Sequence, residues 1–218
     1  MNWSAPQTVA GFARGAPNAT LLDFAARERA RGGRRLLDIG CGAARNAAPL
    51  ACAGWEVVGT DSSWPMLAAA AARKRDDEGG RVHLVQAAMD ALPVAAQSAD
   101  LVIAHGIWNL SSSGAGFRTA VREAARAARP GAGLFLFTFS RHTIPPQASP
   151  VSGETFVFTE FAGEPQCFLT ATELIDELGA AGFLPDPALL LQELNCPSGL
   201  VKATGPVIYE GGFRRAAL

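Results

Sequence analysis

Residues 36 to 46 read Leu36-Leu37-Asp38-Ile39-Gly40-Cys41-Gly42-Ala43-Ala44-Arg45-Asn46, and Asp61 follows 19 residues after Gly42. An apolar run, a glycine turn, a helical stretch, a second apolar run and an acid are typical of a nucleotide-type cofactor site at the edge of a parallel sheet. Glycines let the backbone approach a ligand where a Cβ would collide. A carboxylate after the second strand can bind two ribose hydroxyls, so the stretch predicts a cofactor built on adenosine.

Composition limits the class of protein. The chain has 218 residues, 49% hydrophobic and 18% charged, which predicts one buried core and a single domain. A net charge of −1 and a pI near 6.3 provide no polycation for nucleic acid. We therefore expect no nucleic-acid partner, and a monomer or a homodimer.

Targeting and metal signals are missing from the sequence. Met1-Asn2-Trp3-Ser4 does not lead from basic residues into an apolar run, and Gly, Pro or charge interrupts every apolar run before membrane-spanning length. The four cysteines (Cys41, Cys52, Cys167, Cys196) have neither a CxxC pair nor metal-ligand spacing. These patterns predict a cytoplasmic protein with free thiols, no membrane partner and no metal.

Strand and helix patterns alternate along the chain. Helices are predicted over residues 19–31 with Asn18 as cap, 46–53, 64–75 after a serine cap, and 117–129. Strands are predicted over residues 36–39, 56–60, 82–85, 101–104 and 134–139, with a turn at 129–133. The strands are apolar without alternation, which indicates a parallel sheet covered by helices on both faces.

The rhythm changes after residue 140. Three prolines open a segment with two aromatic-rich runs, 155–161 and 166–169, which we interpret as a short hairpin or lid. A helix is predicted over 172–181, followed by strands over 189–194 and 206–209.

The sequence resembles the class I S-adenosylmethionine-dependent methyltransferases, in their small-molecule branch. The resemblance rests on the order of elements, the Leu-Asp-Ile-Gly-Cys-Gly turn, the acid after strand two and the Arg-Pro-Gly turn before strand five. The resemblance implies an α/β Rossmann-like three-layer sandwich, with a seven-stranded, mostly parallel sheet of order 3-2-1-4-5-7-6 and an antiparallel last strand. It also implies one domain over residues 1–218: an N-terminal helical cap (1–33), a cofactor-binding core (34–140), a lid segment (141–171) and a C-terminal helix with strands (172–218).

Arg45 separates two possible cofactors. A dinucleotide fingerprint needs a third glycine at this position, whereas S-adenosylmethionine has no pyrophosphate to accommodate. A nicotinamide oxidoreductase is therefore disfavoured. Many relatives have glycine at position 44, where this chain has Ala44. The ammonium and sulfonium of the cofactor make Asp38 a sensible indirect partner for its amino-acid end.

The same resemblance places Asp90 at the acid that faces the adenine amino group. The residues expected to bind S-adenosyl-L-methionine, and its product S-adenosyl-L-homocysteine, are Asp38, Gly40, Cys41, Gly42, Arg45, Asp61, Ser62, Met89, Asp90 and His105. Other roles stay open, because the glycines could serve only a turn, Asp61 could cap a helix and Asp90 could be solvated. Asp23, Glu28 and the arginines of residues 27–35 are interpreted as a solvated helix face.

Ligands of open α/β sheets lie beyond the carboxyl ends of the strands. His105, after strand four, is the candidate general base because its usual pKa is near neutrality; a cofactor contact is the alternative. The substrate-pocket candidates are Trp3, Phe12, Trp108, Asn109, Arg141 and His142, and Trp64, Phe139 and the lid aromatics could add to a dry lining. Arg141 either holds an anionic acceptor or is solvated.

The sequence also argues against several acceptors. Residues 104–108 read Ala-His-Gly-Ile-Trp, where relatives that methylate exocyclic amines carry an Asn/Asp-Pro-Pro-Tyr loop. A Pro-Cys nucleophile for pyrimidine carbons is missing, and the cysteines do not support arsenite methylation. We predict methyl transfer by in-line displacement to O, N or S of a small molecule. The alternative is a catalytically weak methyltransferase-like protein that binds the cofactor or scaffolds a partner.

Overall fold

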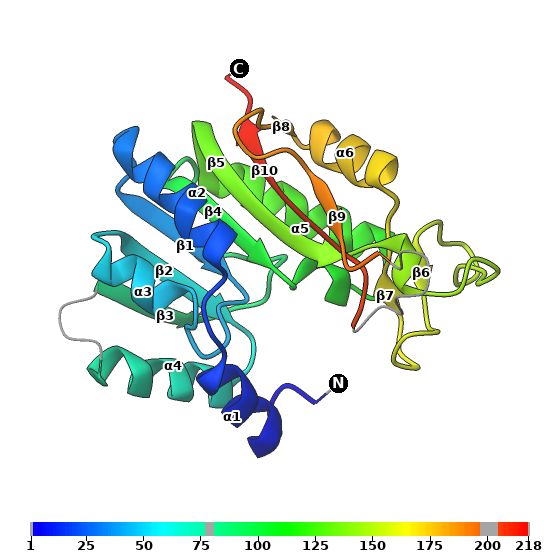
Figure 1. Ribbon diagram of the computed structural model, residues 1–218, viewed down its shortest axis with the longest axis horizontal. Coiled ribbons are helices and arrows are strands. Elements are labelled where there is room, and N and C mark those ends of the chain that lie inside the picture. Colours follow the sequence, from blue (N-terminus) through cyan, green and yellow to red (C-terminus); the bar gives the residue numbers. More distant parts are fainter. Residues whose placement is uncertain (1, 77–80, 197–204, 218) are drawn as a thin grey trace.

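The computed structural model describes residues 2–76, 81–196 and 205–217, which form a twisted sheet between two layers of helices (Figure 1). The sheet order is β3-β2-β1-β4-β5-β10-β8. Its parallel part comprises β3 (Arg81–Gln86), β2 (Glu56–Asp61), β1 (Arg35–Ile39), β4 (Ala99–His105) and β5 (Ala128–Phe139). The long strand β10 (Ile208–Arg215) runs antiparallel to β5. The Rossmann-like fold and the strand order are confirmed.

The edge beyond β10 differs from the single strand that we expected. Two short strands, β8 (Phe183–Pro185) and β9 (Gln192–Leu194), both pair antiparallel with β10, so the described sheet has eight strands in place of seven. Pro185 ends β8 and Pro187 follows it. Proline has no N–H to donate to a ladder, which interrupts the strand here.

Each face of the sheet is covered by its own helices. On one face lie α2 (Ala19–Ala30), α3 (Ala47–Cys52) and α4 (Trp64–Asp76), and on the other α5 (Gly114–Ala127) and α6 (Ala171–Ala180). Leu36 of β1 packs in the apolar cluster beneath α2, α3 and α4, and its neighbour Leu37 packs in the cluster beneath α5 and α6. Burial on both faces explains why the strands lack alternation.

Capping residues set several helix boundaries. Asn18 Oδ1 accepts a hydrogen bond from Leu21 N at 2.9 Å, as predicted for the start of α2. Thr170 and Glu173 form a capping box at the start of α6. Residues 129–133, predicted as a turn, lie within β5, but 129–132 fall in the register shift between the pairs Ala99–Ala128 and Leu101–Gly133, where Gly131 has φ +79°.

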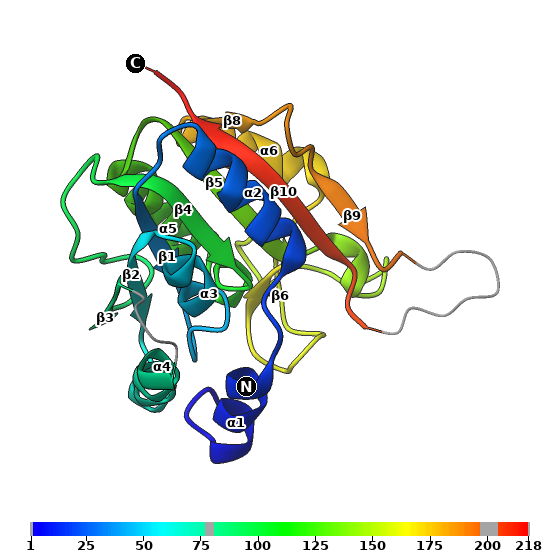
Figure 2. The same ribbon diagram turned by 60° about the vertical axis from the view of Figure 1, so that its left-hand side comes forward.

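Two further segments lie at the carboxyl ends of the parallel strands. Helix α1 (Pro6–Arg14) lies within the segment expected as an N-terminal helical cap, although its bounds were not predicted, and it packs against α4 (Figure 2). In the lid segment, β6 (Val157–Phe158) and β7 (Gln166–Cys167) form a separate antiparallel pair, in agreement with the hairpin interpretation. The short turns η1 (Trp108–Leu110) and η2 (Arg141–Thr143) follow β4 and β5.

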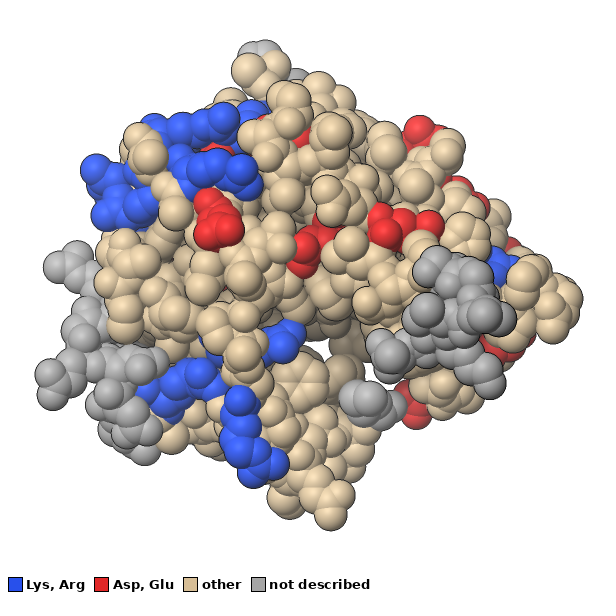
Figure 3. All heavy atoms as spheres, in the orientation of Figure 1, with Lys and Arg blue, Asp and Glu red and all other residues tan. Residues whose placement is uncertain are grey.

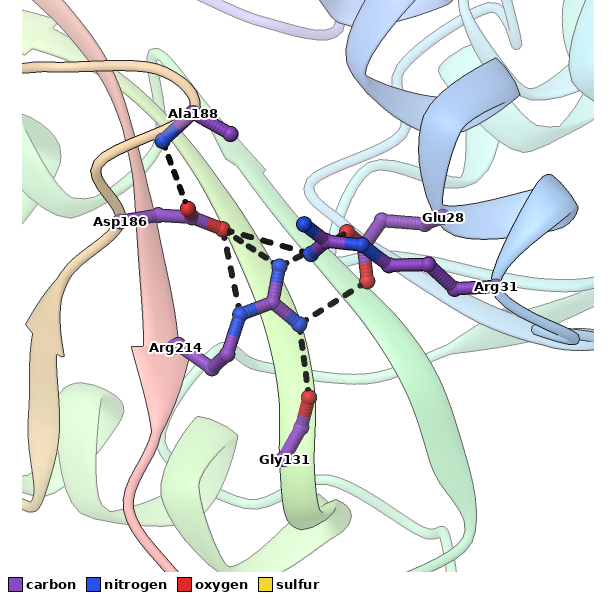
Figure 4. Close-up of polar contacts among 6 residues, drawn as sticks. All are labelled: Glu28, Arg31, Gly131, Asp186, Ala188 and Arg214. Atoms are coloured by element: carbon purple, nitrogen blue, oxygen red, sulfur yellow. Dashed lines mark hydrogen bonds and ion pairs between the residues drawn. The ribbon is translucent and has the colours of Figure 1, made fainter.

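Glu28 was wrongly assigned to a solvated helix face. Asp23 is exposed, but Glu28 is only 5% exposed and binds Arg214 of β10, whose guanidinium also binds Asp186 (Figure 4). The distance from Arg214 Nη2 to Glu28 Oε1 is 2.7 Å, and Arg31 donates to the same carboxylate at 2.9 Å. This cluster joins α2 to β10 and to the loop after β8.

Candidate functional site

The glycine turn after β1 has a left-handed backbone. Gly40 has φ +69° and Gly42 has φ +53°, conformations that glycine adopts without strain. A Cβ at Gly40 would lie 2.7 Å from side-chain atoms of Ile107. Ala44 also has a positive φ, +58°, and therefore carries strain that glycine would avoid.

Asp61, at the end of β2, accepts hydrogen bonds from the glycine turn and from Ser63. Its Oδ2 accepts a hydrogen bond from Gly42 N at 2.9 Å and its Oδ1 accepts one from Ser63 N at 2.8 Å. Burial raises the pKa of Asp61, while these two N–H donors act against that rise. The carboxylate is thus fixed beside the turn, at the carboxyl edge of the sheet.

Asp38 is a buried carboxyl group that lacks a full set of partners. Its side chain is 2% exposed and Oδ2 has no hydrogen-bond partner among the described residues. Burial raises the pKa of Asp38 to about 7, nearby Asp61 raises it too, and Arg45 opposes the rise. Asp38 itself does not line the cavity described below, whereas Gly40, two residues further along the chain, does. An unpartnered buried carboxyl group can be stabilised by a nearby cation.

Arg45 and His105 meet on the other side of the turn. Arg45 Nη2 lies 3.3 Å from His105 Nδ1, and the guanidinium lies 5.8 Å from the ring centroid of Phe12. The imidazole of His105 stacks on Phe137 with ring centroids 4.2 Å apart. Burial and the Arg45 charge lower the pKa of His105 to about 4, so its ring is neutral near pH 7.

These groups surround one cavity of about 290 Å³. Nine of the predicted site residues line it: Trp3, Phe12, Gly40, Gly42, Arg45, Asp61, Ser62, His105 and Asn109. Lining residues absent from the predicted site set are Met66, Gly106, Ile107, Leu110, Phe137, Phe139, Phe161, Ala162 and Gln166. Phe139 and the lid aromatics were expected only as possible lining; the alternation of Phe135, Phe137 and Phe139 was the available signal for the others on β5.

Other predicted residues lie outside the cavity wall. Trp108 is fully buried in the core, where its ring meets Phe117 edge-on at 6.2 Å, and Trp64 is 67% exposed. His142 Nδ1 lies 2.7 Å from Glu193 Oε1 on the exposed surface. Asp90 is exposed and Met89 packs against the core. Trp108 is therefore a core residue. The ligand contacts predicted for the other residues of this group stay predictions.

Arg141 is half-buried and does not line the cavity, so the two roles considered for it stay predictions. Its guanidinium donates to the carbonyls of Ile144, Pro145, Pro146 and Ala148, at distances of 3.1 to 3.4 Å, and lies 4.6 Å from the ring centroid of Phe158. It therefore organises the loop at residues 144–148. Cys41 is buried and burial raises the pKa of its thiol well above the usual range, which disfavours a thiolate nucleophile.

Metal and membrane features are also missing from the described residues. No group of three or more His, Cys, Asp or Glu side chains there could hold a metal ion. Within the same ranges, no helix combines the length and the apolar character needed to cross a bilayer.

The comparison with known protein families agrees with this site. Residues 36–131 match the family described as a methyltransferase domain. The chain is 38% identical over 117 residues to a ubiquinone/menaquinone biosynthesis C-methyltransferase of Syntrophotalea carbinolica, covering 52% of this chain and 47% of the relative. It is 30% identical over 154 residues to a ubiquinone biosynthesis O-methyltransferase of Azorhizobium caulinodans, covering 69% and 59%. The match spans about half the length of these curated relatives.

Solved structures show the same fold. An S-adenosylmethionine-dependent methyltransferase of Methanosarcina mazei superposes with a TM-score of 0.70 at 18% identity, covering 93% of this chain and 100% of that one. The 1,6-didemethyltoxoflavin-N1-methyltransferase of Burkholderia thailandensis, solved with its substrate and S-adenosylhomocysteine, gives 0.67 at 21% identity, covering 91% and 79%.

Proposed function

We propose that the chain is a class I S-adenosylmethionine-dependent methyltransferase and that it transfers a methyl group from S-adenosylmethionine to a small-molecule acceptor. The observation that carries this proposal is the left-handed turn at Gly40 and Gly42, held by Asp61 and open to an aromatic cavity. A turn without a ligand role would not need a cavity beside it.

The residues around the turn fit the proposed cofactor. Asp61 lies where it can accept from ribose hydroxyls, and Ser62 lines the same end of the cavity. The pKa of Asp38 is raised to about 7 in the empty site, and an ammonium group nearby would favour its ionised form, whose Oδ2 has no partner among the described residues. Gly40, Cys41, Gly42 and Arg45 would line the amino-acid end, and Met89 with Asp90 would meet the adenine. These assignments follow the family pattern.

When bound, S-adenosylmethionine would supply an electrophilic methyl group. An acceptor lone pair would form the new bond to carbon, the electron pair of the carbon–sulfur bond would go to sulfur, and the acceptor would lose a proton. The chain's contribution is to exclude water and to hold the acceptor in line. The aromatic rings at Phe137 and Phe139 keep this part of the cavity dry. The neutral ring of His105 can accept the released proton or orient the acceptor.

The acceptor atom stays open within this proposal. The residues favour O, N or S, and the two curated relatives carry names of a C- and an O-methyltransferase. Carbon is therefore also a candidate.

Titration calorimetry with S-adenosylhomocysteine tests the cofactor site. Asp61→Ala should weaken binding by about 1.5–3 kcal/mol, because a charged double contact is lost. Asp23→Ala is the matched control, since Asp23 is an exposed acid on α2 away from the cavity. Failure of the wild-type protein to bind either form of the cofactor would refute the proposal.

Cofactor binding without turnover is the second candidate function. It is favoured by one observation, that the environment of His105 makes the ring a weak base. Release of S-adenosylhomocysteine in the presence of a pool of small metabolites would exclude it, whereas binding without release would support it.

A further inference from the structure

We propose that the acceptor is an uncharged, flat aromatic or heteroaromatic molecule with one polar group, and that Asn109 and Gln166 bind that polar group. The inference rests on the proposed function and specifies the substrate class of the same cavity. It is carried by the side chains that line the cavity on the lid side of His105.

This half of the cavity is apolar and aromatic. Phe137 and Phe139 come from the end of β5, Ile107 follows β4, and Phe161 comes from the lid segment. The rings of Phe139 and Phe161 lie 5.0 Å apart at 59°, and the His105 and Phe137 rings stack at 6°. Such surfaces bind a planar ring through stacking and edge contacts.

Formal charge is confined to the other half. Among the described lining residues only Arg45 and Asp61 are charged, and both lie beside the glycine turn. The nearby cation Arg141 is held by four backbone carbonyls. On the face seen in Figure 3, Lys and Arg gather over α2 and around α1 and α4, with few beside the lid segment. Burial of a charged acceptor here would lack a counter-ion.

Two buried amides supply the polar part of the lid half. Asn109 is 2% exposed and Gln166 is 7% exposed, both line the cavity, and neither Asn109 Oδ1 nor Gln166 Oε1 has a hydrogen-bond partner among the described residues. A buried polar atom without a partner costs about 1–3 kcal/mol. Both oxygens are buried in the structure, so a bound polar group removes that cost only when the amide turns them toward the cavity. The terminal torsion of each amide is broad and allows it to present either oxygen or NH₂.

The amides stand on neighbouring elements. Asn109 belongs to η1 and Gln166 begins β7, and these two elements pack together. The thiol of Cys167 donates to the carbonyl of Ser111 at 3.3 Å, which fixes β7 against the residue that follows η1. The two amides thus line the cavity from two elements that pack against each other.

Three probes with the same ring system test the proposed class: alpha-naphthol, alpha-naphthoate and naphthylmethylammonium. Binding is measured by calorimetry at neutral pH, with and without saturating S-adenosylhomocysteine. We expect alpha-naphthol to bind about tenfold more tightly than either ion. Asn109→Leu and Gln166→Leu should each weaken its binding about five- to tenfold, with unchanged affinity for S-adenosylhomocysteine.

Matched controls separate binding from folding. Gln192→Leu removes an exposed amide on β9, outside the cavity, and should leave alpha-naphthol affinity unchanged. Because Asn109→Leu replaces an unpartnered buried polar group with an apolar one of similar size, its melting temperature should be equal to or above that of the wild type.

Tighter binding of either ion would overturn the inference, as would equal affinity of the three probes. Retention of alpha-naphthol affinity in both leucine variants would overturn it too, as would binding of S-adenosylhomocysteine with no binding of any probe. If S-adenosylhomocysteine alone fails to bind while alpha-naphthol binds as expected, the proposed function fails and the subsite stands.

Discussion

The side-chain amide of Asn18 lies 3.3 Å from the imidazole of His105, measured from Nδ2 to Nε2. Asn18 Oδ1 already accepts from Leu21 N as the cap of α2, so Nδ2 is fixed as a donor. Arg45, which has only donors, faces the other ring nitrogen. The neutral ring carries one N–H, so only one of its nitrogens can accept from these donors. A second proton would place an N–H opposite a donor at both nitrogens, which agrees with the lowered pKa.

Replacement of Asn18 separates the helix cap from the site. Asn18→Ser keeps a capping oxygen but is too short for His105 and for Glu210, whose Oε2 accepts from Asn18 Nδ2 at 2.6 Å. Asn18→Ala loses the cap as well, so it should lower the free energy of unfolding by about 1 kcal/mol more than the serine variant. Both variants should raise the pKa of His105, measured by NMR titration. An unchanged pKa in both would contradict the role of Asn18.

Asp38 and His105 should have opposite effects on stability between pH 4 and pH 6.5. In this window His105 takes up a proton in the unfolded chain, whereas in the folded protein its pKa of about 4 keeps the ring neutral. The contribution of His105 to stability therefore falls as pH falls. Folded Asp38, with its pKa at about 7, holds a proton that the unfolded chain has released, so its contribution rises as pH falls. In the protein without cofactor the two contributions offset one another.

Single variants should reveal how the contribution of each residue to stability changes with pH. Relative to the wild type, Asp38→Asn should gain stability with rising pH, by up to about 1.4 kcal/mol per pH unit, and His105→Asn should lose it by a similar amount. Urea unfolding at a series of pH values measures both differences. Parallel curves for the wild type and the two variants would show that neither group titrates as described.

The sequence predicted the parts of this fold that depend on local pattern. The central strands are apolar because both faces are covered, and Asn18 caps a helix through its own side chain. Contacts between distant segments left no local signal. Glu28 is buried only because Arg214, 186 residues away, reaches it, and a charged residue on a helix otherwise indicates solvent.

The candidate site shows the same division. The glycine turn and Asp61 were predictable because their spacing reflects backbone geometry. In contrast, two adjacent residues after β4 have different surroundings, because Trp108 packs in the core whereas Asn109 lines the cavity. Gln166 was missed because its role depends on how the lid segment packs on η1, which no periodicity encodes.

Glycine at position 44 should relieve backbone strain. Ala44 has φ +58°, a conformation that costs about 1–2 kcal/mol for a residue with a Cβ. Ala44→Gly removes this cost but loses a buried methyl group and gains chain entropy in the unfolded state, so its net effect on stability should be small. Ala43→Gly, at an equally buried alanine without positive φ, loses the methyl with no relief. We expect Ala43→Gly to be more destabilising than Ala44→Gly by about 1 kcal/mol. Equal losses of stability in the two variants, measured by thermal unfolding, would contradict the strain at Ala44.

Arg214 should be the residue on which the cluster of Figure 4 depends. Its guanidinium donates to Glu28 and Asp186, whose side chains are both buried, and to the carbonyl of Gly131 at 2.8 Å. Arg214→Met leaves two buried carboxylates without their shared partner, so it should cost about 3–5 kcal/mol. Arg31→Met is the matched control, because Arg31 is 54% exposed and its pair with Glu28 contributes less than about 1 kcal/mol.

The pH dependence of this cluster has a defined sign. Burial acts to raise the pKa of Asp186, but hydrogen bonds from Ala188 N and Arg214 hold it below its usual value. The stabilisation from Asp186 is therefore present near neutral pH and is lost as the pH falls through the lowered pKa. The difference in unfolding free energy between wild type and Arg214→Met, measured in urea, should shrink from pH 7 to pH 4, because the buried carboxylate of Asp186 takes up a proton once Arg214 no longer holds its pKa down. A difference that is constant with pH would mean that the variant loses packing of the Arg214 side chain and not its charge.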